Sequence, residues 1–533
     1  MYRFFLVAVQ AIEAGLLLGK GVLLIDQHEG DALHLLQIVL RMAGGEVPHV
    51  DFTTPVGALA FAPVAWLIGL GVGAGKAMMG GMLLVALFLL PAIWWVGYSR
   101  LSGPVAWLFG AFVIVLCTAL VYGGGDQAAS ISMYYNRWAW AVALLLLVVA
   151  VVPSARRNPG ADGVLLGLGL VFLALSKITF FVAFLPGILL ALILRRAIAT
   201  TLIGLVAAAV AVLLVTLILG LGFWAAYVND LATISRAGIR GFPGQTLPYL
   251  LVGPAFLAAN LCLLAGIVLL RQSGRAAEGL LLLIFAPAFV YVTYQNWGND
   301  PKWLIGLAVL LMALRPDRAM NNTFGWDIRR SMGVVALVSL VLILPSVVNL
   351  SLANLRHARM SASGYFQVLP GAQNADLAMQ AKRMLAPSRR TAFNLADPAM
   401  RAMADAAVTW QDDVLFGQPL ATCKLESGLV GVLIQMARDL DALPGTSGRS
   451  VLMADTFSNL WMFGATIPLP GGAPWYYGGE AGLERADFIL VPTCPATPMA
   501  RTGILTALAE RRDLTLSEVM RNDLFILLRR GPD

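Results

Sequence analysis

The chain has 533 residues, of which 59% are hydrophobic and 13% are charged. A soluble domain carries about 25% charged residues, so this chain cannot cover a globular surface with polar groups, and a wholly water-soluble protein is excluded. The net charge of +7 does not indicate a nucleic-acid partner, because the basic residues form small clusters between apolar stretches.

Apolar stretches that are long enough to cross a membrane recur along the first 350 residues. They lie at 3–25, 55–73, 77–98, 104–122, 138–153, 161–177, 178–194, 199–222, 249–270, 279–296, 303–315 and 330–349. If residues 26–54 lie outside, the number of membrane crossings within 55–137 is off by one. Either one of these stretches is re-entrant or merged with a neighbour, or Arg100 faces outward. We therefore predict an all-α polytopic domain over residues 1–350, with about 11–13 membrane-spanning helices.

Clusters of arginine separate several of these stretches and mark the predicted cytoplasmic side. They are Arg156 with Arg157, Arg195 with Arg196, Arg271 with Arg275, Arg315 with Arg318, and Arg329 with Arg330. With these clusters inside, the loops 223–248 and 297–302 and everything after residue 350 fall outside. The protein is then expected in a bacterial inner membrane, with a periplasmic C-terminal domain.

Residues 351–533 form this second domain, in which short apolar runs alternate with helical patterns. Strands are predicted at 449–454, 487–492 and 523–529, and helices at 373–385, 427–440 and 499–511. This pattern favours a small extracytoplasmic α/β domain. Cys423 and Cys494 either form a disulfide in an oxidising compartment or remain two buried thiols.

The first outer loop, residues 26–54, is the most informative segment, because it concentrates ionisable side chains that lipid-facing sequence cannot carry. They are Asp26, Glu29, Asp31, Glu46 and Asp51, with His28, His34 and His49. Residues 33–42 within the loop have apolar side chains at helical spacing, which predicts a helix along the membrane surface. The loop is either a solvated connection or a functional site, and the acids on both sides of the surface helix favour a site.

The order of elements in this loop resembles the GT-C glycosyltransferases, membrane enzymes that use polyprenyl-phosphate-linked sugars. They include protein mannosyltransferases and the lipid A aminoarabinose transferase. The matching features are Asp31 at the head of the surface helix, Gly45-Glu46 at its end, and the PHVDF sequence at Pro48–Phe52. The family usually has Asp-Glu where this chain has Asp31-Ala32, with Glu29 two residues before. The resemblance covers the architecture of the whole chain, and about 30 residues at motif level.

The resemblance implies inverting transfer of a sugar from a polyprenyl-phosphate donor to a lipid, glycan or protein acceptor at the outer face. A carboxylate at the water–lipid boundary can take the acceptor's hydroxyl proton, since partial desolvation raises its pKa toward a useful range. We predict Asp31 as this base, Asp51 as a supporting acid and Glu29 as a reserve base. Some family members use a divalent metal; Mg²⁺ or Mn²⁺ would here take ligands from Asp26, His28, Glu29 and Asp31.

A lipid phosphate also needs cations on the outer side, where the positive-inside bias leaves few. The predicted substrate-binding residues are Arg137, Lys177, His34, His49, Tyr135 and Asn136. Arg137 begins a span from the outer side and is either a phosphate contact or an interfacial anchor. Lys177 lies in the sequence LSKIT at 175–179, which resembles a Leu-x-Lys-x-Thr stretch of the family, and phosphate binding is favoured.

Two other functions account for a polytopic chain. A transporter or flippase for lipid-linked saccharides is expected to place charges and broken helices near the membrane midplane, whereas this chain concentrates them in an outer loop. A glycan polymerase or ligase would share the substrate class but would place its largest polar loop between later spans. In the second domain, the aromatic loop that begins at Trp475 either stacks on an acceptor sugar or packs against the membrane domain, and packing is favoured.

Overall fold

The computed structural model describes residues 1–236, 244–295, 300–391, 398–407, 413–475 and 480–531. Within them, seven helices are long and apolar enough to cross a membrane, which identifies a polytopic membrane protein. They are α4 (Ala74–Arg100), α6 (Tyr134–Val151), α7 (Pro159–Ser176), α9 (Ile198–Leu219), α12 (Pro254–Gln272), α13 (Ala276–Gln295) and α15 (Ile328–Arg359).

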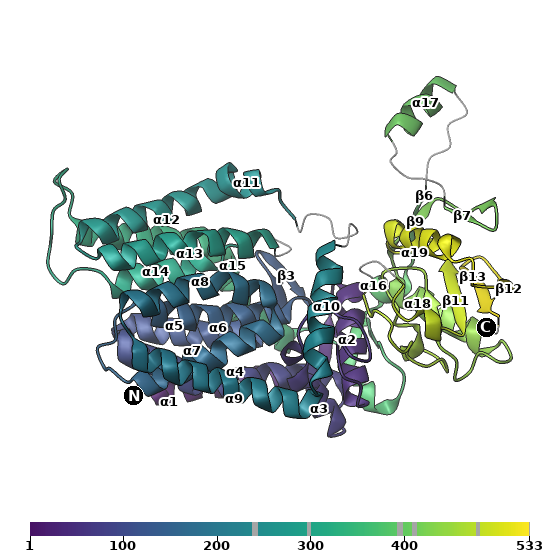
Figure 1. The fold of residues 1–533 in the computed structure, drawn as a ribbon, viewed down its shortest axis with the longest axis horizontal. Helices are drawn as coiled ribbons and strands as arrows, with labels where there is room; N and C mark the ends of the chain where they lie inside the picture. Colours follow the sequence, from purple (N-terminus) through teal and green to yellow (C-terminus); the bar gives the residue numbers. More distant parts are fainter. Residues whose placement is uncertain (237–243, 296–299, 392–397, 408–412, 476–479, 532–533) are drawn as a thin grey trace.

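Four shorter helices lie side by side with the long ones in a single bundle (Figure 1). They are α1 (Tyr2–Leu18), α5 (Gly103–Thr118), α8 (Ile178–Leu194) and α14 (Trp303–Ala313). Helix α6 is central, because 94% of its most apolar window is buried, whereas α9 is mostly exposed apart from Gly204. One side of α9 packs against α7, where Gly163 and Gly167 approach it closely, and its exposed apolar side chains face lipid.

The predicted span at 55–73 is wrong. Its apolar residues form a single short turn, η1 (Ala58–Ala60), and the eight-residue helix α3 (Ala62–Gly69). Eight residues rise about 12 Å, well short of the ~30 Å hydrocarbon core. The chain turns at Gly71, in a left-handed conformation (φ 85°), and then enters α4. Removing this crossing makes the parity of the predicted spans consistent.

Basic residues at the ends of several helices contact neighbouring helix ends on one side of the bundle. Arg100, at the end of α4, forms an ion pair of 2.6 Å with Asp162 in the first turn of α7. Arg195 donates to the carbonyl of Val149 near the end of α6 at 3.2 Å. Residues that the sequence places on the predicted cytoplasmic side therefore lie together at one end.

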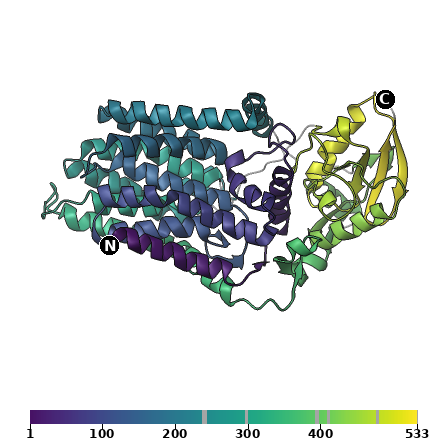
Figure 2. The same cartoon turned by 90° about the horizontal axis from the view of Figure 1, so that it is seen from below.

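Three helices cross the opposite end of the bundle at a steep angle to its axis, as Figure 1 shows for α2 (Glu29–Ala43) and α10 (Gly222–Arg236). The third is α3, and the short helix α11 (Leu247–Val252) precedes α12. Figure 2 shows α2 between the bundle and the C-terminal domain. The predicted surface helix is therefore confirmed as a helix, but protein covers it on both sides rather than lipid on one.

A three-stranded sheet joins the first outer loop to the start of the C-terminal domain. Strand β1 (Leu23–Ile25) pairs in parallel with β5 (Leu377–Gln380), and β5 pairs antiparallel with β4 (Tyr365–Gln367). The predicted helix at 373–385 is accordingly wrong over most of its length. Only α16 (Ala381–Leu385), at its end, is α-helical.

The core of the C-terminal domain is a four-stranded sheet in the order β10-β11-β13-β12. Strand β10 (Val451–Met453) is parallel to β11 (Phe488–Pro492), and β13 (Phe525–Arg530) is antiparallel to β11 and to β12 (Leu516–Arg521). Helices α18 (Leu429–Asp441) and α19 (Pro498–Glu510) belong to the same domain. The α/β prediction is therefore confirmed, with its strands at 449–454, 487–492 and 523–529 and its helices at 427–440 and 499–511. An arm carries β6 (Ser388–Thr391), α17 (Pro398–Ala407), β7 (Val414–Leu415), β8 (Gln418–Pro419) and β9 (Cys423–Ser427).

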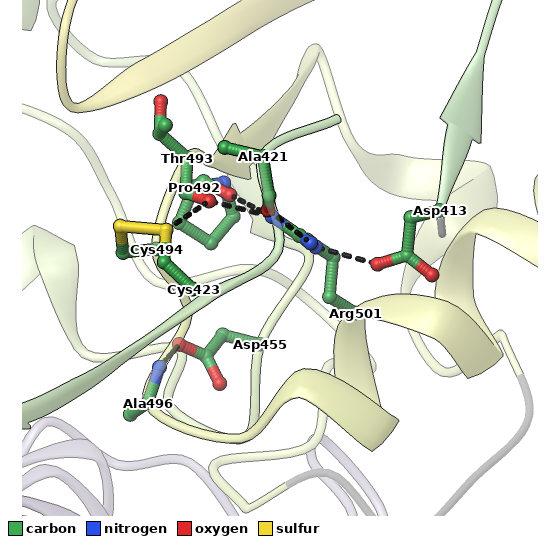
Figure 3. The surroundings of a disulfide bond; sticks show 9 residues. All are labelled: Asp413, Ala421, Cys423, Asp455, Pro492, Thr493, Cys494, Ala496 and Arg501. Carbon is green, nitrogen blue, oxygen red and sulfur yellow. Dashed lines mark hydrogen bonds and ion pairs between the residues drawn. A yellow bond between two sulfur atoms is a disulfide. The ribbon is translucent and has the colours of Figure 1, made fainter. Parts of the chain in front are cut away.

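Cys423 and Cys494 form a disulfide, which joins β9 to the loop after β11 across 71 residues of sequence (Figure 3). Replacing both cysteines by serine is expected to lower the free energy of unfolding of the C-terminal domain by about 2–4 kcal/mol, because the cross-link restricts the unfolded chain. This loss is measured by unfolding the full chain in denaturant and recording, at each concentration, how much of the C-terminal domain a protease cleaves. A reductant should have the same effect on the unaltered protein and none on the double variant; an equal effect on both would contradict the prediction.

Asp455 follows β10 and accepts hydrogen bonds from the backbone amides of Ala496, Thr497 and Thr456 (2.6, 2.9 and 2.7 Å). Burial raises the pKa of Asp455 from 3.8 to about 6 against the effect of these donors. A carboxyl whose pKa is higher in the fold stabilises the fold below its unfolded pKa and loses this contribution as the pH rises through the folded value. We expect the C-terminal domain to lose at most about 3 kcal/mol of stability between pH 4 and 6, and Asp455→Asn to flatten this dependence in unfolding measured across that range.

Candidate functional site

The first outer loop is held between the bundle and the C-terminal domain. After β1 the chain reverses at His28, whose backbone is left-handed (φ 64°), and α2 begins at Glu29. Glu29 and Asp31 lie in the first turn, where acidic side chains interact favourably with the helix dipole. The helix ends at Ala43 with Gly44 as its C-cap, and Gly45 adopts a left-handed conformation (φ 96°) that a glycine accommodates without strain.

Asp31 points from the head of α2 toward the loop that precedes α6. Its Oδ2 accepts a hydrogen bond from the hydroxyl of Ser132. Burial raises the pKa of Asp31 and the charge of Glu29 adds to this rise, while Ser132 and His28 lower it. A carboxylate with a raised pKa binds a proton more readily than an ordinary carboxylate does, which is a property that a general base needs.

A histidine and a tyrosine stand beside this carboxylate. The rings of His28 and Tyr122 are 4.8 Å apart, and Nδ1 of His28 is 3.0 Å from the hydroxyl of Ser130. Tyr122 belongs to a hairpin of β2 (Val121–Gly123) and β3 (Asp126–Ala129) that follows α5. Besides burial, the charges of Asp31, Tyr135 and Asp300 raise the pKa of Tyr122, so these groups lie close to its ring.

Asp300 and Lys302 form a buried ion pair at this end of the bundle. Nζ of Lys302 is 2.6 Å from Oδ2 of Asp300, and the two side chains are 8% and 10% exposed. The same carboxylate accepts from the hydroxyl of Ser346 in α15 and from the amide of Gly124 in the hairpin, at 2.5 and 3.1 Å. This pair therefore fixes the hairpin that carries Tyr122.

Lys177 lies at the junction of α7 and α8, where its Nζ is 5.3 Å from the ring centroid of Tyr135. The charges of Tyr135 and Asp31 both raise the pKa of Tyr122. The predicted cation Lys177 and the predicted base Asp31 therefore border the same group of aromatic residues. A cation–π contact holds an ammonium group over the face of an aromatic ring. The placement agrees with the expected phosphate contact of Lys177, which remains a prediction.

Arg137 is not placed to bind a lipid phosphate. Its side chain is 1% exposed, and its guanidinium donates to the carbonyls of Ala119, Val121 and Ser132 at 2.7, 2.5 and 3.3 Å. Ala119 directly follows α5, Val121 begins β2 and Ser132 lies in the loop before α6, so none of these carbonyls lies within a helix. Arg137 therefore has a structural role, and the two alternatives considered for it, phosphate contact and interfacial anchor, are both corrected.

The other predicted residues of this region also have protein partners. The amide nitrogen of Asn136 lies 2.8 Å from the sulfur of Met133, while its buried oxygen has no hydrogen-bond partner. Nδ1 of His49 is 2.8 Å from Oδ2 of Asp230 in α10. Asp51 accepts from the amide of Val47 at 2.6 Å and so closes a local turn. None of these contacts places Asp51 beside Asp31, so a supporting role for Asp51 is not carried forward.

His34 faces the C-terminal domain. Its ring meets that of Trp475 at a centroid distance of 4.6 Å, and Trp475 also contacts Phe457 at 5.3 Å. Burial lowers the pKa of His34 to about 3, against a hydrogen bond to the carbonyl of Pro474, so the ring is neutral. The aromatic loop thus packs on α2 through Trp475, as the sequence favoured; residues 476–479 of that loop lie outside the described residues.

Asp26, His28, Glu29 and Asp31 do not form a metal site. Asp26 accepts from Tyr365, Glu29 pairs with Arg383, His28 contacts Ser130 and Asp31 accepts from Ser132. In the part of the chain that the structure describes, no three side chains of His, Cys, Asp or Glu gather in a way that could hold a metal ion. The conditional Mg²⁺ or Mn²⁺ set of the sequence analysis is therefore corrected.

Tyr122, Ser130, Ser132 and the Asp300–Lys302 pair were not among the site residues expected from the sequence. The available signal was a short polar stretch, Tyr122–Ser132, between two spans and rich in glycine and serine. Comparisons with protein-family models, curated proteins and solved structures find no match to this chain.

Proposed function

We propose that the chain is a membrane glycosyltransferase of the GT-C type, which transfers a sugar from a polyprenyl-phosphate donor to a lipid, glycan or protein acceptor. Asp31 takes the proton of the acceptor's hydroxyl as its oxygen attacks the anomeric carbon. The bond between that carbon and the phosphate oxygen breaks, the configuration inverts, and polyprenyl phosphate leaves. Lys177 stabilises the negative charge of the leaving phosphate.

The observation that carries this proposal is the gathering of Asp31, Tyr122 and Lys177 at one end of a membrane bundle. Asp31 has a raised pKa and a hydroxyl partner, as a base at the water–lipid boundary requires. Lys177 is connected to it through the rings of Tyr135 and Tyr122. A base and a cation separated by aromatic side chains suit a sugar that is bound between an acceptor hydroxyl and a lipid phosphate.

The topology supports the same side for the site and the C-terminal domain. If α1, α5, α8 and α14 cross the membrane together with the seven longer helices, the chain makes eleven crossings, within the range expected from the sequence. The arginine-rich end is then cytoplasmic. The site and the C-terminal domain are outside, which in a bacterium is the periplasm, and a disulfide is expected in such an oxidising compartment.

The test uses the full chain in lipid nanodiscs with radiolabelled polyprenyl-phosphate mannose, glucose, galactose and aminoarabinose as separate donors. A membrane lipid extract from a strain that lacks the gene serves as acceptor. We expect one donor to be consumed, with label appearing in a new product and polyprenyl phosphate released. If no donor is consumed while lipid-linked sugar crosses the bilayer of proteoliposomes, the transporter alternative replaces the proposal.

A further inference from the structure

The C-terminal domain places an arginine against Glu29, two residues before the candidate base. In α16, Arg383 donates from Nη2 and Nε to Oε2 of Glu29 at 2.9 and 3.3 Å. The side chain of Glu29 is 8% exposed and that of Arg383 is 40% exposed. Glu29 lies two residues before Asp31 in the first turn of α2, so α2 carries two carboxyl groups within one turn.

Contacts on both sides of this ion pair hold the domain against α2. Before it, the hydroxyl of Tyr365 donates to Asp26, and β5 pairs with β1. After it, Phe457 covers Gly30 so closely that a Cβ atom at Gly30 would lie 2.5 Å from the phenyl ring. Arg383 therefore meets Glu29 within an extended, packed interface.

The same interface continues along α2. Nε2 of Gln37 donates to the carbonyl of Pro474 at 2.7 Å, and Nη2 of Arg41 donates to that of Leu469 at 3.1 Å. Beyond the helix, the amide of Thr53 donates to the carbonyl of Gly472 at 3.0 Å. The helix that carries Asp31 is thus fixed by the C-terminal domain at its beginning, its middle and its end.

We propose that Arg383 is a positioning residue of the Asp31 site, and that the C-terminal domain completes this site by neutralising Glu29. Two carboxylates in one helical turn repel each other, and each disfavours the ionised form of the other. The guanidinium of Arg383 binds Glu29 and removes this repulsion, so that Asp31 can ionise and accept a proton. The inference rests on the proposed function in taking Asp31 as the base, but its test does not need sugar transfer.

The other groups that face Asp31 belong to the membrane domain. His28 precedes α2, Ser132 belongs to the loop before α6, and Tyr122 is on the hairpin, near the neutralised Asp300–Lys302 pair. We expect these groups to keep their positions when Arg383 is replaced, because their contacts with Asp31 do not involve Arg383. A shift in the pH at which Asp31 is protonated, after replacement of Arg383, therefore reports the unneutralised charge of Glu29.

The test labels the full chain in nanodiscs with dicyclohexylcarbodiimide, an apolar reagent that reacts with protonated carboxyl groups. Mass spectrometry of the peptide that contains Asp31 measures labelling at this residue between pH 4 and 9. In Arg383→Gln, we expect the pH of half-maximal labelling to move upward, and labelling at pH 7 to rise by up to about tenfold. Unfolding would instead expose Asp31 to water and move the midpoint downward, toward the value of an ordinary carboxyl group.

Two variants serve as controls. Arg383→Lys keeps the positive charge and is expected to restore most of the original midpoint. Arg449→Gln removes another arginine of the C-terminal domain, one that is paired with Asp487 at 3.2 Å near the start of β10, and is expected to leave the midpoint unchanged. An unchanged midpoint in Arg383→Gln, or an equal shift in Arg449→Gln, overturns the inference. An upward shift in a protein that consumes no donor retains the inference and rejects the proposed function.

Discussion

Replacing Asp31 by Asn is expected to lower the rate of sugar transfer by about 10²–10⁴-fold, because the amide cannot accept the acceptor's proton. Asn preserves the size of the side chain, and its oxygen can still accept the hydrogen bond from Ser132. The loss should therefore appear in kcat more than in the binding of the donor. Steady-state transfer with the donor identified from the four candidates measures both quantities.

Glu46→Gln is the matched control for this experiment. Glu46 is another carboxylate of the first outer loop, but it pairs with Arg41 at 2.6 Å and lies beyond the end of α2. Its replacement should leave kcat within a few-fold of the original value. If Asp31→Asn retains more than about a tenth of the activity, Asp31 is not the base, since removal of a general base costs at least about 10²-fold.

The membrane part of the fold follows from the sequence almost directly. Apolar length and arginine position depend on local composition alone, so eleven of the twelve predicted stretches correspond to helices of the bundle. The stretch at 55–73 fails because its proline and glycine residues permit only short helical turns. Hydropathy cannot distinguish such a folded-back segment from a span, since both are buried from water.

The arrangement of the site could not be predicted in the same way. Asp31, Lys177 and the surface helix were expected from residue type and order, but their surroundings depend on contacts between distant segments. The pairing of Leu23 with Leu377 and the ion pair between Glu29 and Arg383 each join residues more than 350 positions apart. Arg137 shows the opposite error, because its residue type indicated a phosphate contact whereas unpaired carbonyls at the end of α5 bind it.

Arg501→Met is expected to lower the free energy of unfolding of the C-terminal domain by about 3–5 kcal/mol, because it leaves a buried carboxylate without its partner. Nε of Arg501 is 2.6 Å from Oδ2 of Asp413, and the two side chains are 3% and 4% exposed (Figure 3). Its guanidinium also donates to the carbonyls of Pro492, Thr493 and Ala421 at 3.1, 2.6 and 3.1 Å. A single side chain thus connects α19, the end of β11 and the segment before β9.

The double variant Arg501→Met with Asp413→Leu separates charge burial from the loss of these backbone contacts. Removing both charges eliminates the unpaired carboxylate, so the double variant should be more stable than Arg501→Met alone. The three carbonyls still lack donors, so it should remain less stable than the unaltered protein. The stability of all three proteins is measured by unfolding the full chain in denaturant and recording how much of the C-terminal domain a protease cleaves. If the double variant is no more stable than Arg501→Met, then Arg501 stabilises the domain mainly through its backbone contacts, and the ion pair contributes little.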